Sequence, residues 1–333
     1  MNHSSRSVCL LFRKPGRFFS IEKVFHQLAP FINRQIPVHT LSVPFSKFNI
    51  RQVLGNIYAS GKSQADIYHI TGDIHYVALG LPRRRTVLTI HDCVFLYQSR
   101  GLKRLVLKWL FLDLPVRRCR IITTISEATK ADIVRYTGCP TDKLVVIPDP
   151  VDQGIYYRPH DFRQKQPVIL FIGTTVNKNL ERVVKALEGV DCLLDIVGRL
   201  TPDQQEALSQ HHIRYRQQAG LTDEEMAEKY AGADLVLFPS TFEGFGLPIV
   251  EGQKAGRPVV TSDLSPMKET AGGAACLVDP LDAASIRAGV LRVIEDKGYR
   301  DGLVQEGFRN VERFAPERIA LQYVACYEKL LNE

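Results

Sequence analysis

The sequence has no long hydrophobic run. No stretch of its 333 residues approaches the ~18 consecutive apolar residues that a membrane-spanning helix needs. The amino-terminal segment MNHSSRSVCLLFRK has an apolar core too short for a secretory signal peptide, and its VCLLF is typical of a strand. We therefore expect a cytoplasmic protein without a membrane span of its own.

Cysteine is present but never clustered. The seven cysteines stand singly, and no Cys-x-x-Cys occurs among them. An odd, scattered set argues against a zinc site and a disulfide framework, and it favours reduced thiols of the cytoplasm. Asp-x-Asp is also missing, so the sequence offers no obvious carboxylate pair for a divalent cation and predicts no metal site.

Acidic residues are scarce in the first half of the chain. Residues 1–155 hold 22 Lys and Arg against 10 Asp and Glu, a balance of +12, whereas the remainder has a balance of −5. A basic half can attract nucleic acid, but no aromatic-basic RNA motif or DNA-binding module is recognisable. Anionic lipid headgroups or a diphosphate-bearing acceptor fit this charge at least as well, so we predict no nucleic-acid partner.

Length and patterning indicate two α/β domains. A chain of 333 residues with 45% hydrophobic and 24% charged residues is globular and too long for one ordinary core. The first half alternates apolar runs with helical patterns, as a doubly wound parallel sheet requires. We set the domains at 1–155 and 156–314 and interpret the polar segment Gln153–Gln166 as the hinge. The predicted strands of the first domain are Val8–Phe12, Val38–Val43, Ile67–Ile70, Thr86–Ile90, Ile121–Ile125 and Leu144–Ile147, and its helices lie around Ile21–Phe31, Lys47–Ser60, Leu102–Leu112 and Glu127–Thr137.

One stretch of the second half, FPSTFEGFGLPIVEGQKAGRPVV, predicts the end of a strand, a loop and a helix. The run Ala233–Phe238 is typical of a buried strand, and Pro248 suits the start of a helix. A strand that feeds a glycine-containing loop and then a helix amino terminus is a general anion site. Glu243, in the loop, and Glu251, in the first helical turn, would repel phosphate, so neighbouring hydroxyl groups are their expected partners. Alternatively, Glu251 complements the helix dipole and Glu243 is a solvated loop residue.

The segment FEGFGLPIVEGQKAGRPVV resembles the Glu-x7-Glu signature of retaining GT-B glycosyltransferases, in particular family 4, the glycosyl transferases group 1. The resemblance implies an α/β fold of two Rossmann-like doubly wound domains facing across a cleft, with residues 315–333 as a helix that packs back on the first domain. It implies that the enzyme works without a metal. It also implies that Glu243 contacts the donor sugar, that Glu251 binds the ribose hydroxyls, and that the intervening loop lies on the donor: Gly244, Phe245, Gly246 and Leu247.

Further donor-binding positions of the second domain follow from the same resemblance. VILFIG ends in Gly173, and Lys178 stands where the family has a lysine on the donor diphosphate. Thr174 stands where the family usually has an arginine, which leaves a hydroxyl and backbone amides at that position. Leu221 belongs to a Gly-Leu pair near which related enzymes hold the base. Arg199 follows the next predicted strand and, apart from the resemblance, is a candidate donor-binding residue that could supply positive charge to the diphosphate in place of Lys178.

The first domain offers fewer candidates. The loop at residues 13–20, RKPGRFFS, has one glycine, Gly16, and three cations, so it either lies against the donor diphosphate or is a solvated basic loop. His91 directly follows the strand TVLTI and resembles the family's histidine that reaches the donor sugar. His69 alternates within a strand and is expected to be packed, whereas His75 lies in a Thr-Gly-Asp loop that could touch the acceptor.

A basic and apolar segment, LKRLVLKWLFLDLPVRRCR, covers residues 102–120. Its apolar side chains recur at helical spacing, with cations to one side. One interpretation is a domain helix with a solvated basic face. The other is a contact with an anionic membrane surface, helped by Arg83–Arg85, since each cation near such a surface adds about 1 kcal/mol.

These features and the resemblance predict a hexosyltransferase with His91, Lys178 and Glu243 as catalytic residues, and the resemblance implies that it is a retaining enzyme. Its co-substrate is a GDP- or UDP-linked sugar, with no further cofactor, and its acceptor is a glycan or a lipid-linked glycan. We expect it to act in cell-surface glycan synthesis, in the cytoplasm or at the inner face of the membrane. The alternatives are a GT-B epimerase of nucleotide sugars and a non-catalytic nucleotide-sugar-binding protein.

Overall fold

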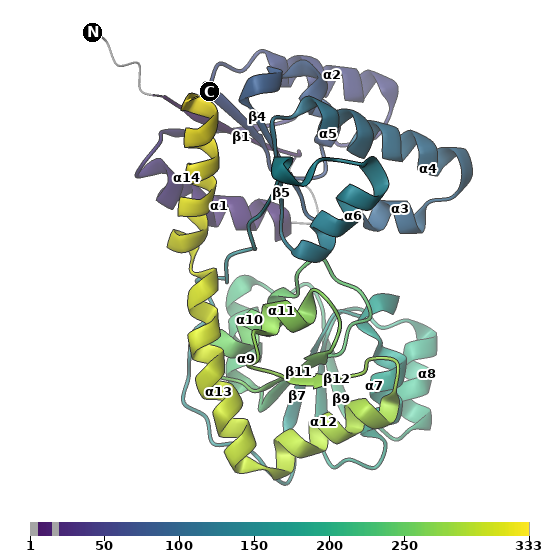
Figure 1. The fold of residues 1–333 in the computed structure, drawn as a ribbon. Coiled ribbons are helices and arrows are strands. Elements are labelled where there is room, and N and C mark those ends of the chain that lie inside the picture. Colours follow the sequence, from purple (N-terminus) through teal and green to yellow (C-terminus); the bar gives the residue numbers. More distant parts are fainter. Residues whose placement is uncertain (1–5, 15–19, 333) are drawn as a thin grey trace. The chain divides into compact units, whose positions relative to one another are not determined.

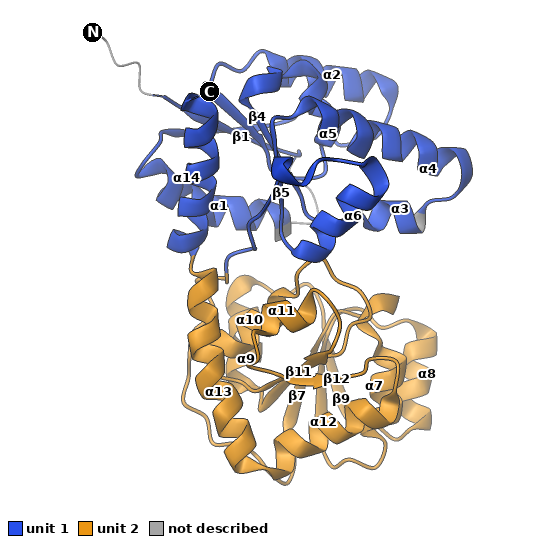
Figure 2. Cartoon of the chain, viewed as in Figure 1, with its two compact units in different colours: residues 1–150, 316–333 blue, residues 151–315 orange. Residues whose placement is uncertain are grey.

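The structure, a computed structural model, describes residues 6–14 and 20–332. The chain forms two compact units: unit 1 contains residues 1–150 and 316–333, and unit 2 contains residues 151–315 (Figure 2). The sequence set the first boundary after residue 155, and the structure sets it after Pro150. Within the described residues, no helix is both long enough and apolar enough to cross a membrane.

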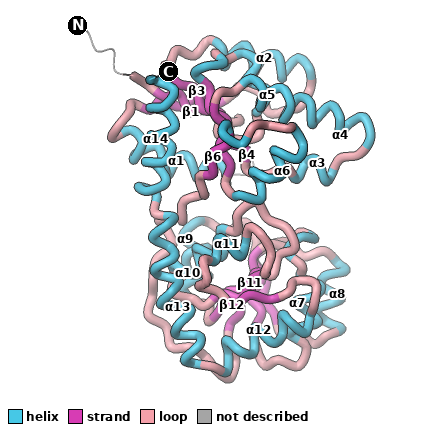
Figure 3. The backbone as a smooth tube through the Cα atoms, in the orientation of Figure 1, coloured by secondary structure: helices cyan, strands magenta, loops and turns pink. Residues whose placement is uncertain are grey.

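Unit 1 is built on a sheet of six strands, and the predicted strands are confirmed to within a residue. They are β1 (Val8–Phe12), β2 (Val38–Ser42), β3 (Ile67–Ile70), β4 (Thr86–Ile90), β5 (Ile121–Thr124) and β6 (Leu144–Val146). All neighbours pair in parallel, in the order β2-β1-β3-β4-β5-β6. Figure 3 draws the strands in magenta among the helices of the unit. In β1, Val8 and Leu10 enter one hydrophobic core and Cys9 and Leu11 enter another. The strand is apolar throughout because both of its faces are covered.

Helices cover both faces of this sheet. One face packs against α1 (Ser20–Asn33) and α14 (Pro316–Asn332), the last helix of the chain. The other packs against α2 (Ile50–Gly61), α5 (Leu114–Arg118) and α6 (Glu127–Thr137). The predicted helix Leu102–Leu112 is irregular: α3 (Val94–Gln98) and α4 (Gly101–Lys108) precede a π-helical turn, Trp109–Asp113, that leads into α5.

Unit 2 repeats the architecture with a different strand order. Its strands are β7 (Val168–Ile172), β8 (Leu193–Val197), β9 (Tyr215–Gln218), β10 (Leu235–Phe238), β11 (Val259–Ser262) and β12 (Cys276–Val278). They pair in parallel in the order β12-β11-β10-β7-β8-β9. One face carries α7 (Leu180–Leu187), α8 (Pro202–Gln210) and α12 (Ala283–Glu295), and the other carries α9 (Asp223–Gly232), α10 (Leu247–Lys254) and α11 (Met267–Ala271), while α13 (Lys297–Val311) follows α12 (Figure 1). The prediction of two doubly wound α/β units is confirmed.

Each sheet has a point at which its connections change direction. In unit 2 the chain runs from β7 to β8 and β9 on one side, and from β10 to β11 and β12 on the other, so the change falls between β7 and β10. In unit 1 it falls between β1 and β3. Ligands of doubly wound sheets bind beyond the carboxyl ends of the strands at such a switch point. The loops that follow these four strands are therefore where a site is expected.

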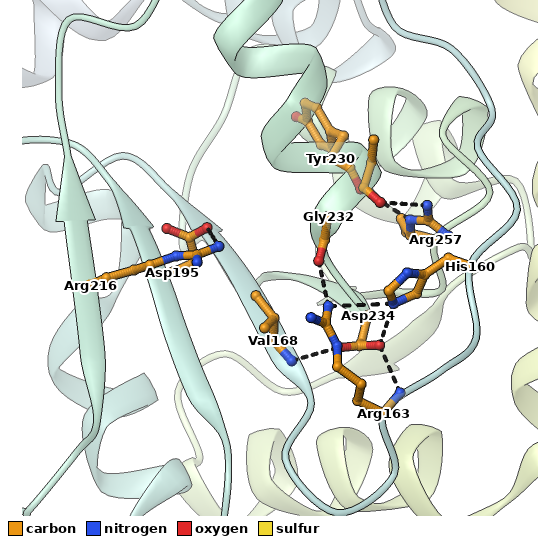
Figure 4. Close-up of polar contacts among 10 residues, drawn as sticks. His160, Arg163, Val168, Asp195, Arg216, Tyr230, Gly232, Asp234 and Arg257 are labelled. Carbon is orange, nitrogen blue, oxygen red and sulfur yellow. Dashed lines mark hydrogen bonds and ion pairs between the residues drawn. The ribbon is translucent and has the colours of Figure 1, made fainter.

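A buried carboxylate fastens the segment before β7 to unit 2. Asp234 is 1% exposed and accepts hydrogen bonds from the backbone N–H of Val168 (2.7 Å) and from Nε of Arg163 (2.8 Å). Nε2 of His160 lies 2.7 Å from the same carboxylate (Figure 4). The second half of the predicted hinge Gln153–Gln166 is therefore part of unit 2 and does not form a free link.

Candidate active site

The loops after β7 and β10 meet at the carboxyl edge of the unit 2 sheet. The first contains a short 3-10 turn, Val176–Lys178, and the second contains Glu243. The Lys178 ammonium donates a hydrogen bond to Oε1 of Glu243 across 2.6 Å, and the two side chains are only 18% and 15% exposed. Two residues that the sequence assigned to one donor molecule therefore form an ion pair at the switch point.

Backbone and amide hydrogen bonds hold the two loops together. The Asn177 side-chain amide donates to Oε1 of Glu243 (3.2 Å), and the Asn177 carbonyl accepts from the backbone N–H of Thr241 (2.8 Å). Asn179 is buried with a left-handed φ of 70° and donates to the carbonyl of Pro239 (3.0 Å). The ion pair thus rests on a preorganised loop pair, as a binding site requires.

Gly173 makes room for the Lys178 side chain. Its φ is 88°, and a Cβ at this position would lie 2.8 Å from Cε and 2.9 Å from Cγ of Lys178. Any larger residue would therefore displace the lysine from its course over the loop. The ammonium also lies 4.7 Å from the centre of the Phe238 ring, which favours a cation at that place.

Glu251 lies in α10 and faces a buried phenol. The helix begins at Leu247, one residue before the predicted start, so Glu251 stands beyond the first turn, which holds no acidic residue. A role limited to complementing the helix dipole is therefore less favoured. Oε2 of Glu251 accepts a hydrogen bond from the Tyr230 hydroxyl at 2.6 Å. Burial and then the charge of Glu251 raise the pKa of Tyr230 well above its ordinary value, so the phenol stays protonated and donates.

The loop between the two glutamates is anchored by Phe245. This side chain is 5% exposed, and its ring lies edge-on to that of Phe314, with 5.4 Å between centroids. Its carbonyl accepts from the Thr270 hydroxyl at 2.8 Å. The buried ring leaves only backbone atoms of Phe245 for a ligand, whereas Gly244 and Leu247 beside it are half-buried.

The remaining donor-binding candidates of unit 2 border the same edge. The Thr174 hydroxyl donates to the Arg199 carbonyl at 2.7 Å, so it is already engaged within the protein. The carbonyl of Thr174 accepts from the Gln204 side chain at 2.8 Å. The Arg199 side chain is exposed, and Leu221 is half-buried in the loop before α9.

The cationic loop after β1 is partly neutralised inside unit 1. The Arg13 guanidinium donates to Oε2 of Glu22 and to Oδ2 of Asp73, both at 3.0 Å. Asp73 follows β3, so this pair spans the unit 1 switch point. Arg13 is consequently not the free cation that the sequence suggested for a diphosphate. Gly16 lies outside the described residues.

His91 follows β4 and is buried, with 8% of its surface exposed. Its Nε2 donates to the Thr71 carbonyl at 2.9 Å, and its Nδ1 lies 4.0 Å from Oδ1 of Asp149. Burial raises the pKa of Asp149, and the neighbouring His91 offsets part of that rise. The histidine is thus held by one carbonyl and faces a buried carboxyl group.

The other two histidines considered are core residues. His69 is fully buried between the Tyr327 hydroxyl and the Thr89 hydroxyl, both at 2.7 Å, and burial lowers its pKa to about 3. Its prediction as a packed residue is confirmed. His75 was expected in an open loop, but it begins a 3-10 turn, is 3% exposed, and donates through Nδ1 to the Phe111 carbonyl. An acceptor contact through its ring is therefore not supported.

Comparison with known proteins identifies the family. Residues 8–154 match the family described as Glycosyltransferase Family 4, and residues 166–296 match Glycosyl transferases group 1. An MMP alpha-(1->4)-mannosyltransferase of Mycolicibacterium hassiacum is 30% identical over 301 residues, which cover 83% of this chain and 73% of that protein. The chain belongs to the group 1 glycosyltransferases. The O-antigen chain mannosyltransferase B of Escherichia coli is 27% identical to this glycosyltransferase over 288 residues, covering 75% of this chain and 72% of the relative.

Solved structures of other proteins have the same fold as this glycosyltransferase. Sucrose-phosphate synthase from Thermosynechococcus elongatus superposes with a TM-score of 0.80 at 17% identity, covering 98% of this chain and 99% of that one. Anabaena HepE in complex with UDP-glucose gives a TM-score of 0.76 at 18% identity, covering 98% and 100%. At such identities the likeness establishes the fold alone.

Sequence reasoning overlooked three residues of these edges. Asn177 donates a hydrogen bond to Glu243, and Tyr230 donates one to Glu251. Asp149 faces His91. Asp149 carried a signal, because it follows β6 in the segment PDPVD. Tyr230 carried none, since its contact with Glu251 depends on two helices that pack on one face of the sheet. Among the described residues of the glycosyltransferase, no three His, Cys, Asp or Glu side chains could together hold a metal ion.

Proposed function

We propose that this glycosyltransferase moves a hexose from a GDP- or UDP-linked sugar to an acceptor hydroxyl, with the donor bound at the carboxyl edge of the unit 2 sheet. The observation that carries the proposal is the Lys178–Glu243 ion pair at the switch point between β7 and β10. An ammonium suits a diphosphate and a carboxylate suits sugar hydroxyls. The adjoining pair therefore matches a ligand in which a phosphate is bonded directly to a sugar.

The neighbouring residues fit the rest of such a donor. Glu251 accepts hydrogen bonds from the ribose hydroxyls, and the Tyr230 phenol keeps its carboxylate oriented. Lys178 offsets the charge that develops on the diphosphate as the sugar leaves. His91 contacts the transferred sugar, which requires its Nε2 to exchange the Thr71 carbonyl for a sugar hydroxyl.

The proposed reaction retains the configuration of the anomeric carbon. The bond between this carbon and the donor phosphate oxygen breaks, and a bond from the acceptor oxygen forms on the same face. The acceptor's proton passes to the departing phosphate, so atoms and charge balance without an enzyme nucleophile. Support for retention comes from the Glu-x7-Glu resemblance of residues 243–251.

The names of similar proteins support the choice of substrates. Two relatives are named as mannosyltransferases, one of them for O-antigen chains, which favours mannose as the hexose and a cell-surface glycan as the product. The HepE structure holds UDP-glucose, which supports a UDP-linked sugar as the alternative donor. The basic residues 1–155 favour a glycan acceptor on a lipid carrier, at the inner face of a membrane.

A thermal-shift screen over GDP- and UDP-sugars tests the donor site. A donor at about 100 times its Kd should stabilise the protein by about 2.7 kcal/mol. Lys178→Ala should abolish most of this effect, whereas Lys185→Ala, which removes an exposed lysine of α7, should leave it unchanged. Stabilisation by no nucleotide sugar, or equal effects of the two variants, would contradict the proposed site. Incubation of the donor without acceptor separates transfer from epimerisation, because an epimerase converts the sugar under these conditions.

A further inference from the structure

Helix α4 turns its apolar side to solvent. Leu102, Leu105, Val106 and Trp109 occur at the i, i+3, i+4 and i+7 spacing that places side chains on one helical face. They are 77%, 63%, 47% and 56% exposed, and α4 contains no buried residue. A helix of a globular domain normally packs such a stripe on the core. The basic face of this segment is solvated, as the interpretation as a domain helix expects, but these four apolar residues are exposed as well. We call them the α4 stripe; Trp109, the last of them, is the first residue of the π-helical turn.

The stripe is exposed although the helix is anchored. The π-helical turn that follows α4 buries Leu112 and sets the Phe111 ring 5.5 Å from the Tyr76 ring and 5.9 Å from the Phe95 ring. Lys108 pairs with Asp113 at 2.7 Å. These contacts fix the carboxyl end of α4 on unit 1, and Figure 1 shows the helix at the periphery of that unit. The outward orientation of the stripe is thus set by packing at the end of the helix.

Positive charge surrounds the stripe. Residues 93–112 contain Arg100, Lys103, Arg104 and Lys108 and no Asp or Glu. The first three of these are exposed. A partner for this face must therefore be apolar where it meets the stripe and anionic around it. A second copy of the same face would bring like charges together and be repelled.

We propose that the α4 stripe inserts into the interfacial region of an anionic bilayer, with Trp109 among the headgroups and the flanking cations on lipid phosphates. This arrangement is that of an interfacial amphipathic helix. The inference deepens the membrane location in the proposed function by naming the docking surface, and it does not depend on which donor is used.

Helix α2 provides a matched comparison. Ile50, Leu54 and Tyr58 are 77%, 59% and 66% exposed, so α2 also displays apolar side chains to solvent. The helix Ile50–Gly61 contains a single cation, Arg51. Apolar exposure alone would make α2 as good a docking surface as α4, whereas the proposal requires α4.

Trp109 is the only tryptophan of the chain, so tryptophan fluorescence, excited at a wavelength that tyrosine does not absorb, reports on this face alone. The full chain is titrated with vesicles of phosphatidylcholine, with and without phosphatidylglycerol. With the anionic vesicles we expect a blue shift of the tryptophan emission and quenching by brominated lipids. Both effects should weaken as the salt concentration rises from about 0.1 M to about 1 M. With neutral vesicles neither change is expected. An unchanged emission spectrum with anionic vesicles would overturn the proposal.

Two triple variants that keep Trp109 locate the contact. Leu102→Gln with Leu105→Gln and Val106→Gln should lower vesicle affinity on the order of tenfold or more, because three apolar side chains no longer enter the interface. Ile50→Gln with Leu54→Gln and Tyr58→Gln should leave vesicle affinity unchanged. Equal losses in both variants would overturn the proposal. Normal vesicle binding by the α4 variant would also overturn the proposal. If that variant in addition changes the sedimentation of the protein without vesicles, the stripe is covered by a second copy of the chain.

Calorimetry with nucleotide sugars accompanies these titrations. The six replaced side chains are exposed, so both variants should fold and bind the donor like the parent. Loss of vesicle affinity with donor binding intact supports the docking surface. Failure of every nucleotide sugar to bind, with vesicle binding intact, would contradict the proposed function and leave the docking surface standing.

Discussion

Replacing Glu243 with glutamine should shift the balance between nucleotide and nucleotide-sugar binding. In the wild type the Lys178 ammonium lies 2.6 Å from this carboxylate, with both side chains less than one-fifth exposed. At an effective dielectric constant of about 20 the Coulomb attraction at this distance is roughly 6 kcal/mol, most of which offsets lost hydration of the two ions. The net value of a hydrogen bond to a charged group is about 1.5–3 kcal/mol, or roughly 10- to 150-fold in affinity.

The two ligands should respond differently to the Glu243→Gln change. A nucleoside diphosphate gains a lysine whose charge is no longer shared, so its affinity should rise by up to that factor. A nucleotide sugar also gains the unshared charge of Lys178, but it loses the carboxylate that accepts hydrogen bonds from its sugar hydroxyls. Its affinity should therefore stay near the wild-type value. The signature is therefore a changed ratio of the two dissociation constants, accompanied by slower transfer.

Isothermal titration calorimetry with GDP, UDP and the corresponding sugars measures this ratio. Glu181→Gln is the matched control, because it removes an exposed carboxylate from the first turn of α7 without touching Lys178. If Glu243→Gln and Glu181→Gln leave the ratio equally unchanged, the ion pair does not contact the donor, and the assignment of Lys178 and Glu243 is refuted.

Three further predictions concern single contacts. Tyr230→Phe removes the hydrogen bond that orients Glu251 and should weaken nucleotide binding by about 0.5–1.5 kcal/mol in calorimetry, and undiminished affinity would separate Glu251 from the ribose. Asp234→Ala leaves the buried N–H of Val168 without its acceptor, so the free energy of unfolding in urea should fall by about 1–3 kcal/mol, and a loss as small as that of an exposed ion pair would count against this role. Because the folded pKa of His69, about 3, lies below its unfolded value, the unfolded chain binds a proton that the folded chain excludes as pH falls from about 6.5 towards 3. The contribution of His69 should therefore lower the free energy of unfolding by about 1.4 kcal/mol for each unit by which the pH falls. In His69→Gln the free energy of unfolding in urea should depend less on pH than in the wild type. Parallel pH profiles of the two proteins would contradict a buried neutral imidazole.

The strands were predictable because their signals are local. A parallel strand covered on both faces must be apolar at nearly every position, as VCLLF of β1 and TVLTI of β4 are. The bounds of the unit 1 strands therefore came out within a residue, whereas the predicted strand Ala233–Phe238 begins two residues before β10. The Glu-x7-Glu segment was equally readable, since the strand, the loop and the helix all lie within residues 233–260.

The ion pairs were not predictable because they join distant parts of the chain. Lys178 and Glu243 are 65 residues apart, and Arg13 and Asp73 are 60 apart. They meet because of the strand order, which no local pattern encodes. The sequence therefore suggested a ligand for Lys178 and either a ligand or solvent for Arg13, whereas the structure pairs each cation with a carboxylate of the protein. The α4 stripe illustrates the same limit: its periodicity predicted a helix with an apolar face, but only packing decides whether that face meets a core.

The place of α14 in unit 1 bears on how the chain is made. Ile319, Tyr323 and Tyr327 of this helix are buried in the unit 1 core, and the Tyr327 hydroxyl bonds His69 of β3. During synthesis the first 150 residues emerge early, yet the part of one sheet face that α14 covers beside α1 stays open until residues 316–333 have left the ribosome. Unit 2 is complete before then. The part translated first is thus the last to finish folding, and a nascent chain arrested before Pro316 would present the apolar area that α14 covers to chaperones and proteases.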